Sequence, residues 1–274
     1  MVSTEGAPRG TLSKFQAYWV TRDTILWNVI GSPKYTYFLH YAPAGDLKLE
    51  VGKISGGSTL SLQYAKGGPD PAVFEKFPQL LGFTALKLNP EDVSKVPEIL
   101  KGQFAVTVRD DQGKLLDATS LQIPGVIDDL YTYTGPLGID FSSGSPVIRL
   151  WAPTARSVQL QLFPDSNPAS PPQLYPMQLD PQTGVWSVSG DASWLGKFYL
   201  FQVEVYVPRE EQVVQNVVTD PYSLSLSMNS TRSQVINLEE PSIKPAGWDA
   251  LGARAIHREA EGIWIGHHVL DDLF

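Results

Sequence analysis

Cysteine is absent from this sequence of 274 residues, which excludes disulfide bonds, zinc–thiolate sites and thiol nucleophiles. No apolar run approaches the ~20 residues that a membrane-spanning helix needs. The N-terminal stretch MVSTEGAPRGTLSK lacks the hydrophobic centre of a secretory signal. Charged residues make up only 18% of the chain, and the net charge is −8. Nucleic acid and anionic membranes are therefore poor candidate partners, whereas this charge does not oppose a neutral partner.

Motifs of several common kinds of active site are also missing. There is no glycine-rich phosphate loop and no Ser-His-Asp set. His267 and His268 diverge on an extended chain, and no second cluster supplies further metal ligands. Four neighbouring carboxylate pairs diverge in the same way, and we interpret them as solvated surface charge. We expect no catalytic residue, no metal site and no cofactor. The four pairs are Asp128-Asp129, Glu210-Glu211, Glu239-Glu240 and Asp271-Asp272.

Glycine and proline are plentiful, with 23 and 22 residues, and they separate short runs of β-forming residues. The runs SKFQAYWV and TILWNV are predicted to form a hairpin around Arg22 and Asp23. In GQFAVTVRD, alternation places Phe104, Val106 and Val108 on one face of a strand. The pattern predicts an all-β protein made of two consecutive antiparallel, immunoglobulin-like β-sandwich domains.

One short helix is predicted near residues 90–100, in NPEDVSKVPEILKG. Asn89 is placed to cap it, Pro90 suits its first turn, and the acidic residues that follow favour its positive end. Because Pro97 interrupts the register, we expect a short helix followed by a second turn.

The β-pattern resumes after the turn-rich stretch IPGVIDDLYTYTGPLGIDFSSGSP, which indicates a domain boundary near residue 127. Beyond it, KFYLFQVEVYVP alternates from Tyr199 to Val207, as is typical of an antiparallel sheet with one wet side. The predicted domains are residues 1–126 and 127–247, followed by a tail at 248–274.

Five segments of the second half occur in a characteristic order: RLWAPTARSVQLQLF, GVWSV, WLGKFYLFQVEVYVP, VTDPYSLSLSMNSTRSQVINL and KPAGWD. Together they resemble carbohydrate-binding module family 48, the immunoglobulin-like domain ahead of the barrel in starch- and glycogen-debranching enzymes. In the first half, AYWVTRDTILWNV, FPQLLGFTALKL and LQIPGVIDDLYTYTGPLG are similar to the N-terminal β-domain of plant limit dextrinases and related pullulanases. The resemblance covers roughly residues 15 to 250.

This resemblance implies that the complete protein hydrolyses α-1,6 branch points in starch-type glucans with a barrel of glycoside hydrolase family 13. The DVVYNH-like and GFRFD-like strand ends that precede the family's catalytic carboxylates are missing here. The tail GIWIGHHVLDDLF also departs from the family's first barrel strand, so we expect a truncated gene model or an altered reading frame near Arg254. We predict the non-catalytic N-terminal region of a debranching enzyme, inactive alone, located in the plastid stroma or cytoplasm. The alternative is a stand-alone module that either binds α-glucan or has a regulatory role.

The expected partner is an α-glucan such as starch or limit dextrin, bound weakly or through the missing barrel. Glycogen-binding members of family 48 present a pair of tryptophans, but the corresponding segments here, LFPDSNPAS and YVPREEQVVQN, contain none. We also expect self-association through the apolar surface that would face the barrel.

Aromatic residues are the remaining candidates for sugar contact, because sugars lay their apolar ring faces on exposed aromatic rings. Trp19 and Trp27 flank the predicted hairpin and are candidate carbohydrate-binding residues, with core packing as the alternative. Alternation in VIRLWAP places Trp151 opposite the core face. We interpret Trp151 as a contact with the absent barrel, with ordinary core or a sugar platform left open. Asp220 and Tyr222 in TDPYS are predicted to lie beside the same interface.

Overall fold

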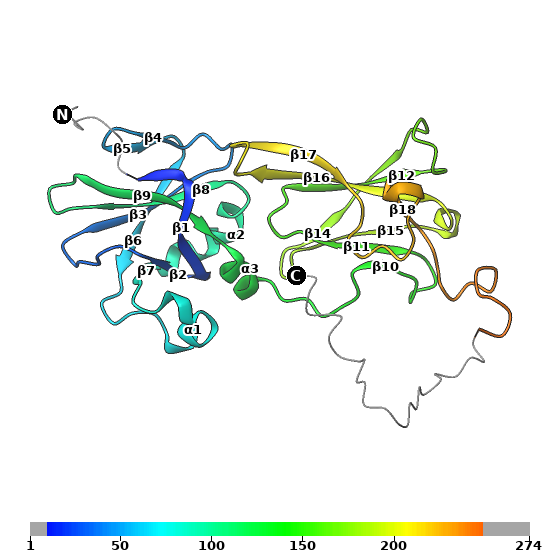
Figure 1. Cartoon of the computed structure of the whole chain (residues 1–274), viewed down its shortest axis with the longest axis horizontal. Helices are drawn as coiled ribbons and strands as arrows, with labels where there is room; N and C mark the ends of the chain where they lie inside the picture. The colour runs from blue at the N-terminus through cyan, green and yellow to red at the C-terminus, as the bar shows by residue number, and fades with distance from the viewer. Residues whose placement is uncertain (1–9, 249–274) are drawn as a thin grey trace, which may run out of the picture. The chain divides into compact units, whose positions relative to one another are not determined.

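The computed structural model describes residues 10–248 (Figure 1). The chain divides into two compact units, Met1–Ile236 and Asn237–Phe274. All strands and helices of the described residues lie in the first unit. None of these helices has both the length and the apolar character that a membrane crossing requires.

Seven strands form the first half of the fold: β1 (Thr11–Thr21), β2 (Thr24–Trp27), β3 (Thr36–Ala42), β6 (Ser58–Tyr64), β7 (Thr84–Leu88), β8 (Gln103–Arg109) and β9 (Leu115–Gln122). They close into a barrel in the order β1-β2-β7-β6-β3-β8-β9 (Figure 1). The predicted hairpin is confirmed, because β1 pairs antiparallel with β2. A separate two-stranded sheet consists of β4 (Lys48–Glu50) and β5 (Lys53–Ser55).

Strand β1 closes the barrel, because it also pairs in parallel with β9. Its register shifts between Phe15 and Ala17 and again between Trp19 and Thr21. Such bulges bend a strand and increase its twist, which lets β1 hold a different neighbour on each side. The prediction of a sandwich was therefore wrong for this half of the chain. The protein is mostly β as predicted, but its first half is a closed barrel without free edges.

Strand β8 alternates as predicted, yet both of its faces are covered. Val106 and Val108 join the barrel core, whereas Ala105 belongs to a second cluster that includes Leu47. The Gln103 side chain also points to this second cluster, where its Oε1 accepts a hydrogen bond from the Leu47 amide at 2.8 Å. The outer face of β8 is therefore buried under the segment that leads into β4.

His40 is a buried residue of strand β3, which lies between β6 and β8 in the barrel wall. His40 Nε2 lies 2.9 Å from Thr107 Oγ1, and its Nδ1 lies 3.0 Å from Thr59 Oγ1. Burial, with a smaller effect of the charge on Arg109, lowers the pKa of His40 from 6.5 to about 4. Both ring nitrogens are thus partnered by hydroxyl groups, which satisfy a neutral imidazole.

The helix predicted near residues 90–100 is present as two consecutive turns. They are the 3-10 helix η2 (Pro90–Lys95) and α2 (Val96–Ile99). Asn89 precedes them, but the predicted side-chain cap is wrong. Its amide instead donates to the carbonyl oxygen of Ser61 at 3.1 Å, since β6 lies within its reach.

Two further helices have no counterpart among the predicted elements. Helix α1 (Pro71–Lys76) follows Asp70, whose carboxylate accepts an amide hydrogen bond from the first turn. Helix α3 (Pro124–Leu130) packs so closely on β1 that a Cβ at Gly125 would approach Val20 Cα at 2.8 Å. Besides η2, the described residues contain the short 3-10 helices η1 (Pro78–Leu80), η3 (Ala192–Trp194) and η4 (Met228–Ser230).

Two antiparallel sheets form the second half of the described fold. The first has the order β10 (Gly138–Asp140), β11 (Val147–Trp151), β15 (Val185–Ser189) and β14 (Gln178–Asp180). The second has the order β13 (Gln173–Pro176), β12 (Ser157–Phe163), β16 (Phe198–Val207) and β17 (Gln212–Val218), with β18 (Ser233–Gln234) beside β16. Buried residues from both sheets, such as Ile148 and Leu160, form one core, as predicted for a β-sandwich.

Strand β16 follows the predicted alternation over only part of its length. Tyr199 and Phe201 are fully buried in the sandwich core, whereas both faces are half-buried from Val203 onward. Val203 still packs against the sandwich core, and beyond it Val205 lines a hollow beside the barrel.

Candidate functional site

Both tryptophans predicted to bind sugar lie inside the barrel. Trp19 is 0% exposed and Trp27 is 1% exposed. Trp19 pairs across the hairpin with Ile25, and Trp27 pairs with Ala17, so the two indoles share the inner face. A ring without an exposed face offers no platform to a sugar. The structure therefore supports the alternative of core packing for these two residues.

Trp151 lies where the alternation of β11 places it. Ile148 and Leu150 are buried, whereas Arg149 and Trp151 are half-buried on the opposite face. The indole N–H of Trp151 donates to the carbonyl oxygen of Thr183 at 3.0 Å, which fixes the ring against the turn before β15. One part of the ring therefore packs, and the other part remains open to a partner.

The open part of Trp151 borders a surface hollow of about 380 Å³, which we call the aromatic hollow. Its phenol groups come from the segment after α3, where Tyr131 and Tyr133 are two residues apart and thus on one side of an extended chain. The Tyr133 hydroxyl donates to the carbonyl oxygen of Pro136 at 3.1 Å. Six residues line the aromatic hollow: Asp128, Tyr131, Thr132, Tyr133, Leu137 and Trp151.

The turn that contains Asp220 is held by a buried polar network. Tyr199 Oη donates to Asp220 Oδ2 at 2.6 Å, and the Tyr222 amide donates to Asp220 Oδ1 at 2.8 Å. The Asp220 amide in turn donates to Ser233 Oγ at 2.9 Å. Asp220 is only 3% exposed, so it stabilises the turn through these hydrogen bonds and does not itself face a partner.

Burial changes the acid–base properties of this network. It raises the pKa of the Asp220 carboxyl above its usual 3.8, against the two hydrogen bonds that favour the carboxylate. It also raises the pKa of Tyr199 strongly, with the neighbouring Asp220 charge as a further cause. The Tyr199 hydroxyl is therefore a fixed hydrogen-bond donor to Asp220.

A run of exposed apolar side chains begins at the end of β17 and passes through this turn. We call residues 217–228 the exposed apolar segment. Met228 is 85% exposed and Leu224 is 56% exposed. Exposed apolar residues concentrated in one segment mark an interaction surface more often than scattered ones do. The exposed large hydrophobic residues of this segment are Val217, Val218, Tyr222, Leu224, Leu226 and Met228.

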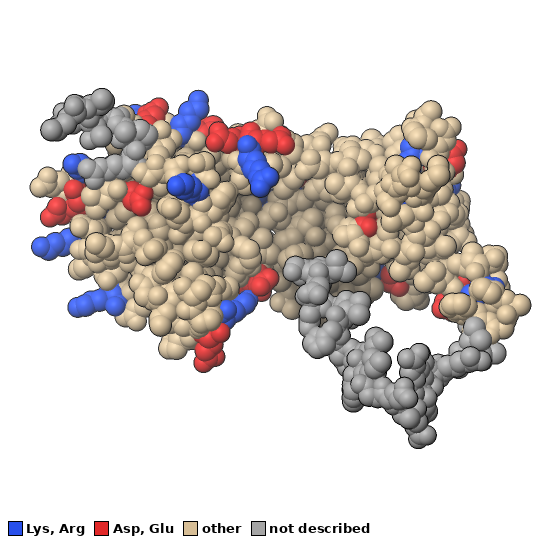
Figure 2. All heavy atoms as spheres, viewed as in Figure 1, with Lys and Arg blue, Asp and Glu red and all other residues tan. Residues whose placement is uncertain are grey.

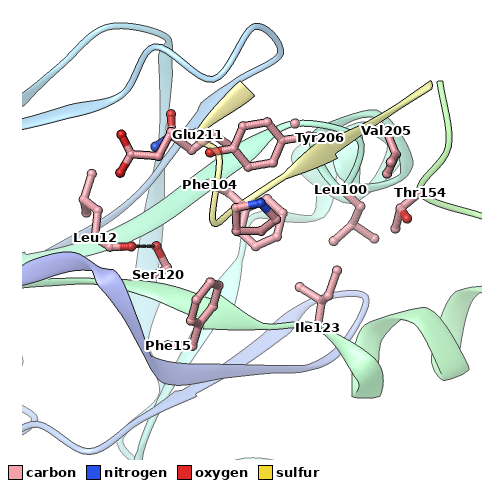
Figure 3. Close-up of a pocket in the computed structure, with 13 residues that line it drawn as sticks. Leu12, Phe15, Leu100, Phe104, Ser120, Ile123, Thr154, Val205, Tyr206 and Glu211 are labelled. Atoms are coloured by element: carbon pink, nitrogen blue, oxygen red, sulfur yellow. Dashed lines mark hydrogen bonds between the residues drawn. The ribbon is translucent and has the colours of Figure 1, made fainter. Parts of the chain in front are cut away.

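A smaller hollow of about 140 Å³, the junction pocket, lies where β16 approaches β8 and β9 (Figure 3). In Figure 3, Leu100, Phe104 and Ile123 surround the space, with Tyr206 at its upper side. The Ser120 hydroxyl at its edge donates to the carbonyl oxygen of Leu12 at 2.6 Å. This largely apolar lining suits packing rather than acid–base chemistry.

The carboxylate pair within α3 is engaged in surface ion pairs. Asp129 accepts from Arg22 Nε at 3.0 Å, and Asp128 lies 3.3 Å from Lys76 Nζ. Figure 2 shows that charged side chains gather mainly over β1–β9 on this face and are sparse over β12–β18. Residues 10–248 hold no cluster of three potential metal ligands. His267 and His268, where no metal site is expected, lie outside the described residues.

Two known families match the two halves of the chain. Residues 14–129 match the pullulanase N2 domain. Residues 136–223 match carbohydrate-binding module 48, the isoamylase N-terminal domain. The first match covers the barrel strands from within β1, and the second covers the two sheets except β18 and ends at Ser223 in the exposed apolar segment.

The sequence of this chain is similar to that of proteins named pullulanase. Pullulanase 1, chloroplastic, from Arabidopsis thaliana is 36% identical over 236 residues, which cover 86% of this chain and 24% of that protein. Pullulanase from Klebsiella pneumoniae is 33% identical over 242 residues, which cover 86% of this chain and 21% of that protein. The chain thus spans about a quarter or less of the length of these relatives.

Two solved structures are similar to this chain in both fold and sequence. The crystal structure of PulA from Klebsiella pneumoniae in complex with maltotriose has a TM-score of 0.79 and 32% identity, over 88% of this chain and 26% of that chain. The crystal structure of PulA from Klebsiella oxytoca has a TM-score of 0.79 and 32% identity, over 88% of this chain and 22% of that chain.

Fold and matches together define two β-domains: a closed barrel that matches the pullulanase N2 domain and a two-sheet sandwich that matches carbohydrate-binding module 48. Over 86% of its length the chain is similar to the N-terminal part of proteins named pullulanase, and its two halves match the pullulanase N2 domain and carbohydrate-binding module 48.

Sequence reasoning missed the aromatic hollow, although part of its signal is present in the stretch DDLYTYTGP. Turn residues dominate the surrounding stretch and conceal the alternation of Tyr131 and Tyr133. The approach of Trp151 to these tyrosines depends on tertiary contacts, which no local pattern contains.

Proposed function

We propose that this chain is the non-catalytic accessory part of a starch-debranching pullulanase, which positions a catalytic domain toward α-1,6 branch points in starch-type glucans. The exposed apolar segment is the observation that carries this proposal. An exposed apolar surface whose turn is held in place by the buried hydrogen bonds of Asp220 suits a permanent contact with another domain. Trp151 and Tyr222 are the proposed contact residues, and Asp220 positions the turn.

The domain limits proposed for this arrangement are 1–126 for the N2 domain, 127–247 for the module and 248–274 for a separate tail. The proposed compartment is the plastid stroma, which the chloroplastic relative from Arabidopsis supports. The isolated chain is also proposed to self-associate. The reason is that the apolar side chains of the exposed apolar segment remain exposed to solvent within residues 10–248.

A fusion experiment tests the contact. The chain replaces the corresponding region of the Arabidopsis relative, and pullulan hydrolysis and thermal stability of the fusion are measured. Leu224→Ser and Tyr222→Ser are expected to lower the melting temperature of the fusion but not that of the isolated chain. Leu174→Ser is the matched control, because Leu174 is 51% exposed on β13, outside the exposed apolar segment. Equal effects of all three substitutions would contradict the proposal.

A second candidate function is direct glucan contact at the aromatic hollow. Its volume of about 380 Å³ lies within the range of small-molecule sites. It combines the Trp151 and tyrosine rings with the polar groups of Asp128 and Thr132. A glucosyl unit would lay its apolar face on a ring and direct hydroxyl groups to the polar rim.

Titration with maltotriose or β-cyclodextrin, followed by tryptophan fluorescence, tests this second function. The expected response is weak, saturable and lost in Trp151→Ala. Trp248→Ala is the control, because Trp248 is 55% exposed in the other compact unit. A flat titration at millimolar ligand, or a response that survives Trp151→Ala, would exclude the aromatic hollow.

A further inference from the structure

The barrel and the sandwich belong to the same compact unit, and the chain passes between them through residues 131–137, which connect α3 to β10. A single covalent connection permits rotation of one domain against the other unless a second contact opposes it. Tyr131 of this connection is only 8% exposed, and a Cβ at Gly184 would approach its ring at 3.3 Å. The connection is therefore packed on the sandwich, and a second contact with the barrel decides whether the two domains rotate.

Such a contact joins the turn after β3 to the hairpin of β16 and β17. A Cβ at Gly45 in this turn would meet Tyr206 Cε2 at 2.6 Å and the carbonyl oxygen of Glu211 at 2.9 Å. Beside them, Arg156 Nη1 donates to the carbonyl oxygen of Pro43 at 3.2 Å. One turn of the barrel is therefore held from two elements of the sandwich, the hairpin and the start of β12.

The backbone on both sides of this contact is in the left-handed region. Gly45 has a φ of 85°, which glycine adopts without a steric penalty. Glu211 has a φ of 52°, which is unfavourable for a residue with a Cβ. Unfavourable backbone conformations persist where the surrounding structure determines them. The carbonyl group of Glu211 is the group that packs on Gly45, so the contact itself favours this conformation.

The ring of Tyr206 contributes to the contact by packing. Burial, with the neighbouring Glu211 charge as a further cause, raises the pKa of Tyr206 to about 12. The ring and Glu211 border the junction pocket together with Phe104 and Leu12 of the barrel (Figure 3). Because this hollow of about 140 Å³ leaves part of the junction without packed side chains, the contacts at its rim contribute more to the attachment.

From these observations we infer that the turn at residues 43–45 and the hairpin of β16 and β17 form a latch, which fixes the sandwich on the barrel so that both move as one rigid body. The contact of Gly45 with Tyr206 and Glu211 is the centre of the latch. Its release would leave residues 131–137 as a hinge. The inference concerns this chain alone, and it does not depend on the proposed glucan or catalytic-domain contacts.

Distance distributions between two spin labels on the full chain test the latch. Because the sequence contains no cysteine, Leu81→Cys in the barrel and Leu174→Cys in the sandwich provide two unique label sites, at residues that are 72% and 51% exposed. A narrow distribution is expected. Tyr206→Ala removes the ring and is expected to broaden the distribution about twofold or more. Tyr206→Phe keeps the ring and is the matched control, for which no change is expected.

A second pair of variants tests the latch from the side of the barrel. Gly45→Ala is expected to broaden the distribution, because its Cβ would collide with the hairpin. Gly68→Ala is the matched control, since Gly68 has a similar φ of 78° but a Cβ there would meet nothing within 4 Å. Circular dichroism shows whether each variant is folded, and the Tyr206 pair decides alone if Gly45→Ala is not.

Three results would overturn the inference. The first is a broad distribution without any substitution in the latch, which would show that the domains already rotate freely. The second is an unchanged distribution in Tyr206→Ala. The third is an equal effect of the two members of either matched pair, which would assign the broadening to the backbone or to the hydroxyl group instead of the contact.

Discussion

The hydroxyl group of Tyr199 donates a 2.6 Å hydrogen bond to Oδ2 of Asp220, and both side chains are almost fully buried. Strand β16 is thereby connected to the turn at Asp220, which lies within the exposed apolar segment. The turn keeps its shape although its neighbours Tyr222 and Leu224 are exposed. A contact surface that is fixed before its partner arrives loses less conformational entropy on binding.

Removal of this hydrogen bond is expected to destabilise the chain. Tyr199→Phe leaves a buried carboxylate without one donor, at a cost of about 1–3 kcal/mol in the free energy of unfolding. Urea unfolding at neutral pH measures this cost. Tyr206→Phe is the matched control on the same strand, because no hydrogen bond of the Tyr206 hydroxyl occurs within the described residues, and a change below about 0.5 kcal/mol is expected. Equal losses would show that the network contributes nothing specific.

Acid is expected to weaken the barrel through His40. Its folded pKa of about 4 lies below its ordinary value of 6.5, so the unfolded state binds more protons between these values. The stability associated with neutral His40 is therefore complete above pH 6.5 and is lost as the pH falls toward 4. The full loss is about 3 kcal/mol. Unfolding free energies of wild type and His40→Gln at pH 7 and pH 4.5 test this, and a pH-dependent difference near zero would contradict it.

Arg232 is expected to order the proline-rich loop that follows β12. Its guanidinium donates to the carbonyl oxygens of Asp165 and Asn167 at 2.8 and 2.9 Å and lies 3.6 Å from the centre of the Phe163 ring. Arg232→Lys retains the charge but not the fork of donors, so it should not restore the loop. Limited proteolysis should therefore cut near Asn167 faster in Arg232→Lys than in wild type. Unchanged cleavage would show that the loop orders itself.

Close packing of α3 on β1 predicts a strong effect at one glycine. A Cβ at Gly125 would meet the backbone of Val20 at 2.8 and 2.9 Å, and backbone atoms cannot move aside cheaply. Gly125→Ala is expected to cost about 1–3 kcal/mol in the free energy of unfolding. Gly67→Ala is the control, because a Cβ there would meet nothing within 4 Å. A neutral Gly125→Ala would show that α3 packs less tightly than described.

Local patterns predicted much of the fold. Alternation correctly placed Ile148 and Leu150 in the sandwich core and Trp151 on the other face of β11. Barrel closure was missed, because β1 meets β9 at pairs such as Thr11 and Thr119, which are more than a hundred residues apart. A β-strand has the same local sequence pattern in a barrel and in a sandwich, so only this distant pairing separates the two architectures.

The candidate site was less predictable, because exposure of a single aromatic residue depends on the whole fold. Trp19 and Trp151 both lie on strands with alternating patterns, yet Trp19 faces the barrel interior and Trp151 faces a hollow. The hairpin register that turns Trp27 inward depends on the bulge in β1. Asp220 was placed in the correct turn, but its burial depends on Tyr199 and Ser233, which come from other strands.

Pullulan hydrolysis by the purified chain of 274 residues is the most direct test of the accessory role. We predict that the chain alone releases no reducing ends, whereas its fusion to the catalytic remainder of the Arabidopsis relative releases them. Hydrolysis of α-1,6 bonds by the chain alone, retained through purification to homogeneity, would contradict the accessory role.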